Sequence, residues 1–89
     1  MMMKHGNTIV ELYQMPEPEL TEIRKRPNGK IDHIAFDVDD IDETYAMLKA
    51  NGFRIIEDAP VYLGFWKNGC KYINILGPDD ERLEFCQIL

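Results

Sequence analysis

Three polar residues of this chain have the types and the strand positions that could bind a metal ion: His33, Glu84 and Glu11. Each lies in a stretch where apolar and polar residues alternate, which is typical of a half-buried β-strand. The alternation puts His33 and Glu84 on the strand faces opposite the main apolar side chains, and it puts Glu11 on one face with Tyr13. One imidazole and one or two carboxylates around a common hollow suit a divalent metal such as zinc, nickel, manganese or iron.

The same residues have structural interpretations that need no metal. An antiparallel sheet often exposes one polar face to water, and Glu84 would then be a solvated surface residue. A single histidine in a strand is commonly a hydrogen-bonded core or surface residue, so the sequence alone leaves the role of His33 open. The sequence contains no motif for nucleotide binding or for a serine or cysteine nucleophile. It has no phosphate-binding loop, no Gly-x-Ser-x-Gly sequence and no base near either cysteine.

The strand that carries His33 is predicted to run directly into one amphipathic helix within residues 31–52. Asp40 predicts the helix N-cap, and Glu43 stands at the third helical position, as in a capping box. Gly52 predicts the left-handed residue that ends the helix. The strand face that should pack beneath this helix carries Ile34, Phe36 and Val38.

The other segments predict short strands. Residues 7–14 predict a strand with no hairpin partner nearby, and residues 15–30 predict a proline-rich linker with one helical turn near residues 19–24. Residues 53–57 predict a short edge strand, and residues 58–64 an irregular segment. Asn68-Gly69, between residues 65–67 and 70–76, predicts a two-residue type I′ hairpin. Residues 82–89 predict the last strand, so the order from residue 31 is β-α-β-β-β. The predicted core consists of Ile34, Phe36, Tyr45, Leu48, Leu83 and Phe85.

Length and composition bound the class of protein. A chain of 89 residues, 45% hydrophobic and 29% charged, predicts one small globular domain with a thin core that a partner chain would help to cover. The net charge of −6 argues against nucleic acid or an anionic membrane as partner. No apolar run is long enough to span a bilayer or act as a signal peptide, so we expect a cytoplasmic protein. Cys70 and Cys86 are then expected to be reduced thiols.

Three segments carry a resemblance to a known superfamily: HIAFDVDDID from His33, LKANG ending at Gly52, and GPDDERLEF from Gly77. Together they resemble the C-terminal module of the vicinal oxygen chelate superfamily, which includes glyoxalase I, bleomycin resistance proteins, methylmalonyl-CoA epimerase and extradiol dioxygenases. The resemblance covers residues 31–87. It implies an α+β fold in which a βαβββ module forms a curved mixed sheet with one main helix, preceded here by an extra N-terminal strand.

The resemblance also implies a role for each polar residue. In the glyoxalase and epimerase branches, each module gives the metal one residue from its first strand and a glutamate from its last, and these positions match His33 and Glu84. Residues 7–14 resemble the last strand of a preceding module, with Glu11 at that module's metal position. We therefore expect residues 1–30 to form an arm and residues 31–89 the module. The implied cofactor is a divalent metal, with zinc or nickel ahead of manganese or iron.

Two classes of function follow from the resemblance. The first is a metal-dependent lyase or isomerase resembling glyoxalase I, in which Glu84 or Glu11 moves a proton between adjacent carbons through a metal-stabilised enediolate. The second is a non-catalytic small-molecule binding protein of the bleomycin resistance type, or an inactive relative that lacks the first module. The aromatic residues Tyr62, Phe65 and Trp66 would fit a binding cleft, although aromatic residues at such positions more often serve ordinary packing. Because one curved half-sheet leaves its concave face open, we expect a homodimer that pairs two modules.

Overall fold

The computed structural model describes residues 1–27 and 31–89. The chain divides into two compact units, Met1–Lys30 and Ile31–Leu89. The last three residues of the predicted linker, 28–30, lie outside the described residues. No helix within the described parts of the chain is long and apolar enough to cross a membrane.

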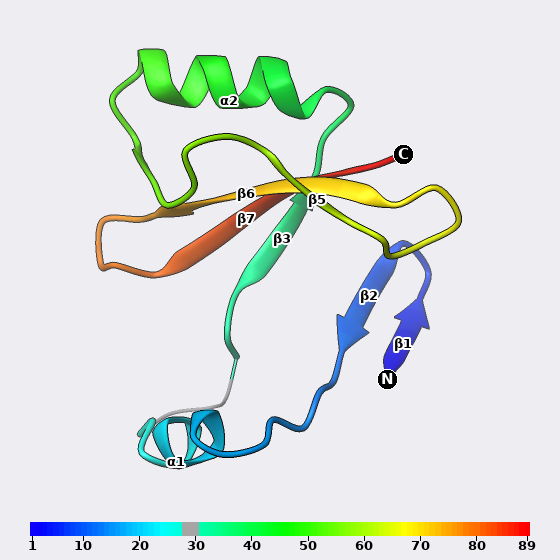
Figure 1. Cartoon of the computed structure of the whole chain (residues 1–89), viewed down its shortest axis with the longest axis vertical. Coiled ribbons are helices and arrows are strands. Elements are labelled where there is room, and N and C mark those ends of the chain that lie inside the picture. The colour runs from blue at the N-terminus through cyan, green and yellow to red at the C-terminus, as the bar shows by residue number, and fades with distance from the viewer. Residues whose placement is uncertain (28–30) are drawn as a thin grey trace. The chain divides into compact units, whose positions relative to one another are not determined.

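The first unit contains a β-hairpin and a short helix (Figure 1). Strands β1 (Met2–His5) and β2 (Thr8–Glu11) pair in antiparallel register, so the expectation that this strand has no hairpin partner is wrong. The two residues between them are Gly6 and Asn7, and Gly6 has a φ of 61°, as the first central residue of a type II′ turn requires. The Gly-Asn pair was the signal for this hairpin. Helix α1 (Glu19–Arg24) lies where the sequence predicts a helical turn.

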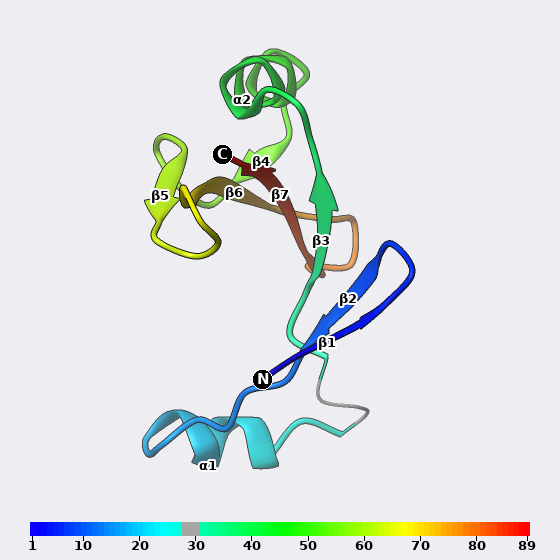
Figure 2. The same ribbon diagram turned by 90° about the vertical axis from the view of Figure 1, so that its right-hand side faces the viewer.

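The second unit is a mixed sheet with one helix on one face, which confirms the α+β class (Figures 1 and 2). The helix is followed by one strand more than the predicted βαβββ order contains. The strand order is β3 (Ile34–Asp37), β7 (Arg82–Ile88), β6 (Cys70–Leu76) and β4 (Arg54–Ile55). Strand β3 runs parallel to β7, and the other pairs are antiparallel. Helix α2 (Ile41–Ala50) packs over β4, β6 and β7.

Both ends of α2 form as the sequence predicts. The side chain of Asp40 accepts a hydrogen bond from the backbone N–H of Glu43 at 3.0 Å, which satisfies one of the free donors of the first turn. At the other end Gly52 has a φ of 76°. Its N–H donates to the Lys49 carbonyl while that of Phe53 donates to the carbonyl of Leu48, and this pair of bonds is a Schellman motif.

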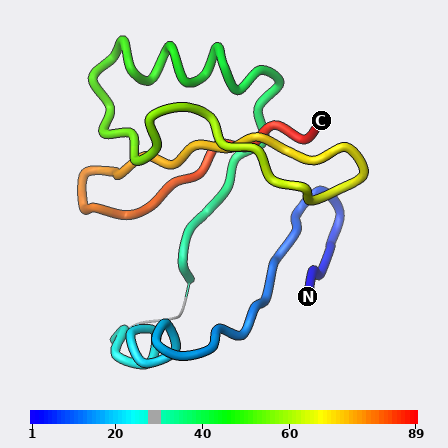
Figure 3. Tube along the Cα trace, viewed as in Figure 1, coloured from blue at the N-terminus to red at the C-terminus, as the bar shows by residue number. Residues whose placement is uncertain are grey.

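The predicted two-residue hairpin at Asn68-Gly69 is wrong. The strand that pairs with the start of β6 is β5 (Val61–Leu63), in a register that opposes Leu63 to Cys70 and leaves residues 64–69 as a longer loop (Figure 3). Trp66 within this loop has a φ of 65°, which breaks the strand expected at residues 65–67 because a left-handed residue cannot continue a pleated strand. Strands β4 and β5 both pair with β6 along the same edge.

The core lies between α2 and the centre of the sheet. Ile41, Leu48, Ile73 and Ile75 are buried, and Tyr45, Leu83 and Phe85 pack against them with Val38 and Ile55. The inclusion of Ile34 and Phe36 in the core is wrong, because their residues remain 56% and 47% exposed. They belong to the edge strand β3, which α2 does not cover. Phe36 still stacks on Phe85, with ring centroids 5.7 Å apart.

The two cysteines are free thiols, as expected. Cys70 is buried and Cys86 half-buried, on the neighbouring strands β6 and β7. Burial raises the pKa of Cys86 to about 12, and the nearby Cys70, Glu84 and Asp37 raise it in the same direction. The Cys86 thiol is therefore protonated and weakly nucleophilic at neutral pH.

Candidate functional site

A cluster of polar side chains lies on the face of the sheet that points away from α2. Leu83 and Phe85 of β7 pack against the core under the helix, so Glu84 between them points to the opposite face. The register sets Ala35 of β3 on one side of Glu84 and Asn74 of β6 on the other. This face carries the residues for which the sequence predicts chemistry.

His33 and Glu84 lie together in this cluster. The imidazole Nε2 of His33 is 3.3 Å from the carboxylate Oε1 of Glu84, and the two side chains are 19% and 18% exposed. Strand β3 begins at Ile34, so His33 precedes the strand rather than lying inside it. The ladder between β3 and β7 starts with the pair of Ile34 and Leu83, and His33 lies directly before it.

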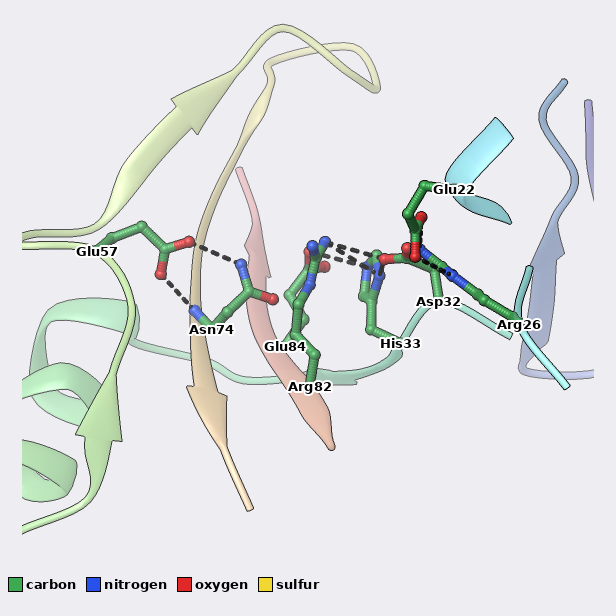
Figure 4. Close-up of polar contacts among 8 residues, drawn as sticks. All are labelled: Glu22, Arg26, Asp32, His33, Glu57, Asn74, Arg82 and Glu84. Atoms are coloured by element: carbon green, nitrogen blue, oxygen red, sulfur yellow. Dashed lines mark hydrogen bonds and ion pairs between the residues drawn. The ribbon is translucent and has the colours of Figure 1, made fainter. Parts of the chain in front are cut away.

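Asp32 orients the imidazole of His33 (Figure 4). Asp32 Oδ1 lies 2.7 Å from His33 Nδ1, while Arg82 Nη2 lies 3.1 Å from the same nitrogen and 3.4 Å from Asp32 Oδ1. Arginine can only donate, so the shorter contact with the carboxylate assigns a proton to Nδ1. Arg82 is then held chiefly by its ion pair with Asp32.

This arrangement turns the Nε2 lone pair of His33 towards Glu84. A ring nitrogen without a proton and a carboxylate are both acceptors, and they repel each other unless a proton or a cation lies between them. A histidine that donates its other N–H to a carboxylate is the usual arrangement of a metal-binding histidine in proteins. The donor set therefore fits a divalent metal, with an imidazole and a carboxylate as its ligands.

One chain supplies too few ligands for a closed metal site of the usual kind. Among residues 1–27 and 31–89, no group of three or more His, Cys, Asp and Glu side chains is placed to hold a metal ion. Structural zinc sites use about four protein ligands and catalytic ones about three. His33 and Glu84 are thus two of the three or four protein ligands that such a site uses.

The third predicted residue, Glu11, belongs to the other unit. It is the last residue of β2, is exposed, and pairs with Met2 across the hairpin. Its role at the metal site therefore stays a prediction.

Three further residues of the cluster were not singled out from the sequence: Asp32, Asn74 and Glu57. Glu57 accepts hydrogen bonds from both the backbone N–H and the side-chain amide of Asn74 (Figure 4). Asn74 interrupts an otherwise apolar run between Ile73 and Ile75, and a polar residue in a buried strand is a usable signal. Asp32 directly precedes His33, but its contact with the ring depends on how the chain enters β3.

Comparison with known proteins agrees with this fold and with the resemblance noted in the sequence. Residues 1–74 match the family model described as the Glyoxalase/Bleomycin resistance protein/Dioxygenase superfamily. The chain belongs to this family, the vicinal oxygen chelate superfamily. A relative from Bacillus subtilis (strain 168), named "Uncharacterized protein YwbC", is 32% identical over an alignment that covers 93% of this chain and 71% of the relative.

Two solved structures have a similar fold. One, printed as "conserved domain protein", aligns with a TM-score of 0.55 at 20% identity over 73% of this chain and 56% of its own. The other is TioX from Micromonospora sp. ML1, with a TM-score of 0.53 at 15% identity over 91% of this chain and 58% of its own. The chain thus spans little more than half the length of these structures.

Proposed function

We propose that His33 and Glu84 bind a divalent metal ion, with zinc or nickel ahead of manganese or iron. The observation that carries this proposal is the separation of 3.3 Å between His33 Nε2 and Glu84 Oε1, with Asp32 at 2.7 Å from the other ring nitrogen. Imidazole nitrogen and carboxylate oxygen together suit these borderline metals better than calcium or magnesium.

We further propose that a second copy of this chain completes the site in a twofold dimer. Such a dimer would bring two histidines and two glutamates together on its axis, because a twofold interface repeats each residue. The edge strand β3, directly after His33, exposes the apolar side chains of Ile34 and Phe36, which supports an interface at this edge. The free thiols of Cys70 and Cys86 fit a cytoplasmic location.

The reaction that we propose is a proton transfer between adjacent carbons of a small molecule, as in glyoxalase I. The metal ion would supply positive charge that stabilises a negatively charged oxygen of the substrate. Glu84, or Glu11 if the hairpin supplies it, removes the proton from the carbon that bears the hydroxyl group. The same carboxyl group then returns this proton to the neighbouring carbon, while the hydroxyl proton passes to the oxygen of that carbon. With a glutathione hemithioacetal this isomerisation converts the substrate into a lactoyl thioester, with no oxidant or reductant consumed.

A second candidate is a non-catalytic binding protein of the bleomycin resistance type. Three aromatic side chains within five residues favour it, since Tyr62, Phe65 and Trp66 are 59%, 49% and 43% exposed. Exposed aromatic rings on a chain with a net charge of −6 suit a flat cationic ligand. This reading requires no metal.

The two candidates separate in one assay. The protein is loaded with zinc or nickel and mixed with the hemithioacetal of methylglyoxal and glutathione, and formation of the thioester is followed. Turnover by the parent protein that disappears in Glu84→Gln supports the lyase. Absence of turnover, together with binding of a cationic glycopeptide that Trp66→Ala abolishes, would favour the binding protein.

A further inference from the structure

The side-chain oxygen of Asn74 is a buried acceptor without a hydrogen-bond partner among the described residues. Asn74 is 3% exposed and is the buried polar residue at the centre of β6. Its Oδ1 is fully shielded, and no donor from residues 1–27 or 31–89 reaches it. Buried polar atoms are nearly always paired, because a lost partner leaves the cost of desolvation uncompensated.

Glu57 determines which end of the Asn74 amide faces it. Glu57 Oε1 accepts a hydrogen bond from the Asn74 backbone N–H at 2.6 Å, and Oε2 accepts one from Asn74 Nδ2 at 2.8 Å. An ionised carboxylate can only accept, so the amide nitrogen must point to Glu57. The oxygen is thereby forced to point the other way.

The oxygen of Asn74 is turned to the side of Glu84 (Figure 4). Asn74 and Glu84 are direct partners in the antiparallel register of β6 and β7, so their side chains share one face, with Cβ atoms about 4.5–5.5 Å apart. The amide oxygen therefore faces the side of a carboxylate whose Oε1 lies 3.3 Å from His33 Nε2. Acceptors gathered in this way are stabilised by a cation or by a group that donates hydrogen bonds.

We propose that Asn74 is a further binding residue of the His33 and Glu84 site, and that Glu57 is its positioning residue. Asn74 Oδ1 would accept a hydrogen bond from an O–H group bound at this site. Glu57 keeps this oxygen turned inward without touching the metal. The inference rests on the proposed metal site and adds an oxygen acceptor to it.

The substitution Glu57→Gln tests this inference. A glutamine at this position can donate from its amide to Asn74 Oδ1, so the Asn74 amide turns over and presents its nitrogen to Glu84. Metal-free stability should stay level or rise, because the unpaired oxygen gains a donor. Zinc affinity measured by calorimetry should fall at least tenfold, because a donor now faces the site. Glu43→Gln, which removes the same charge on α2, is the matched control and should bind zinc like the parent.

The outcomes separate this inference from the metal site itself. Equal zinc affinity in the parent and in Glu57→Gln would overturn the role of Asn74 and leave the metal site standing. Absence of zinc binding by the parent would overturn the metal site and, with it, this inference. If Glu57→Gln fails to fold, NMR of the parent decides: zinc must shift the side-chain amide signals of Asn74 and leave those of Asn51 on α2 unchanged. Unshifted Asn74 signals would overturn the proposal.

Discussion

Leu83 on β7 lies directly beside Ile34 on β3 in the parallel register, yet only Leu83 packs against the buried core. We expect Leu83→Ala to lower the free energy of unfolding by about 2–5 kcal/mol, because it leaves a cavity under α2. Ile34 is 56% exposed, so Ile34→Ala should cost about 0.5 kcal/mol or less in the monomer. Urea unfolding at low protein concentration measures both. Leu83→Ala could instead cost less than about half a kcal/mol, as a surface substitution does. That result would mean that Leu83 faces away from the core and Glu84 towards it.

The exposed edge of β3 tests the proposed assembly. Light scattering should give the mass of a dimer at micromolar concentration. Ile34→Lys should shift the protein to a monomer that keeps its circular dichroism spectrum, because it puts a charge into the proposed interface. Met47 on α2 is 51% exposed, and Met47→Lys is the control that should leave the mass unchanged. A well-folded parent monomer at micromolar concentration would contradict the dimer and the shared site.

The N-cap of α2 should contribute measurably to stability. Asp40→Ala removes the acceptor that holds the Glu43 N–H at 3.0 Å, and we expect a loss of about 0.5–2 kcal/mol in the free energy of unfolding. Asp40→Asn keeps a capping oxygen and loses only the charge, so its loss should be clearly smaller. Thermal unfolding of the three proteins side by side makes the comparison. Equal losses in both variants would show that charge, and not the hydrogen bond, is what matters there.

The raised pKa of Cys86 predicts a loss of stability in alkali. Its pKa of about 12 in the folded protein lies above the ordinary value of 9.0, so between these values the folded chain holds a proton that the unfolded chain releases. The contribution of the protonated Cys86 thiol to the free energy of unfolding is therefore complete below pH 9 and is lost as the pH rises towards 12. The midpoint of urea unfolding is measured at intervals of about one pH unit between about pH 8 and pH 11. It should fall less steeply with rising pH for Cys86→Ala than for the parent. Parallel curves would contradict this account.

Local signals in the sequence were sufficient to predict helix α2 and its two ends. Asp40 and Gly52 mark the ends of α2 through hydrogen bonds that they make within a few residues, and such contacts depend on the local sequence alone. The strand between residues 61 and 63 was missed, because pairing with β6 decides it and the loop that follows is longer than Asn68-Gly69 indicates. Pairing across the sheet is not encoded in one segment.

Some residues of the candidate site could likewise be predicted from the sequence, and others could not. Alternation along the strands places His33 and Glu84 on one face, and the structure brings their side chains together. The orienting contact of Asp32 and the bonds between Glu57 and Asn74 could not be read from alternation. They depend on how the chain enters β3 and on the edge where β4 pairs with β6, which only the folded sheet defines.

The position of Ile34 shows that alternation along a strand does not by itself predict burial. Its alternation with Phe36 gives the correct face of β3, but burial depends on what covers that face, and α2 packs over the other strands. A side chain can therefore share the register of a core residue without belonging to the core.

The most direct test of the account is calorimetric titration of zinc and nickel into the metal-stripped protein and into three variants. We expect the parent to bind, and His33→Ala and Glu84→Gln to lose binding altogether, because each substitution removes two ligands from a site on a dimer axis. Folding should survive both changes, since neither side chain belongs to the apolar core. Glu11→Gln should bind like the parent if the hairpin is structural, and more weakly if it supplies a ligand. Equal binding by the parent, His33→Ala and Glu84→Gln, or no binding by any of them, would contradict the metal site and favour the metal-free binding protein.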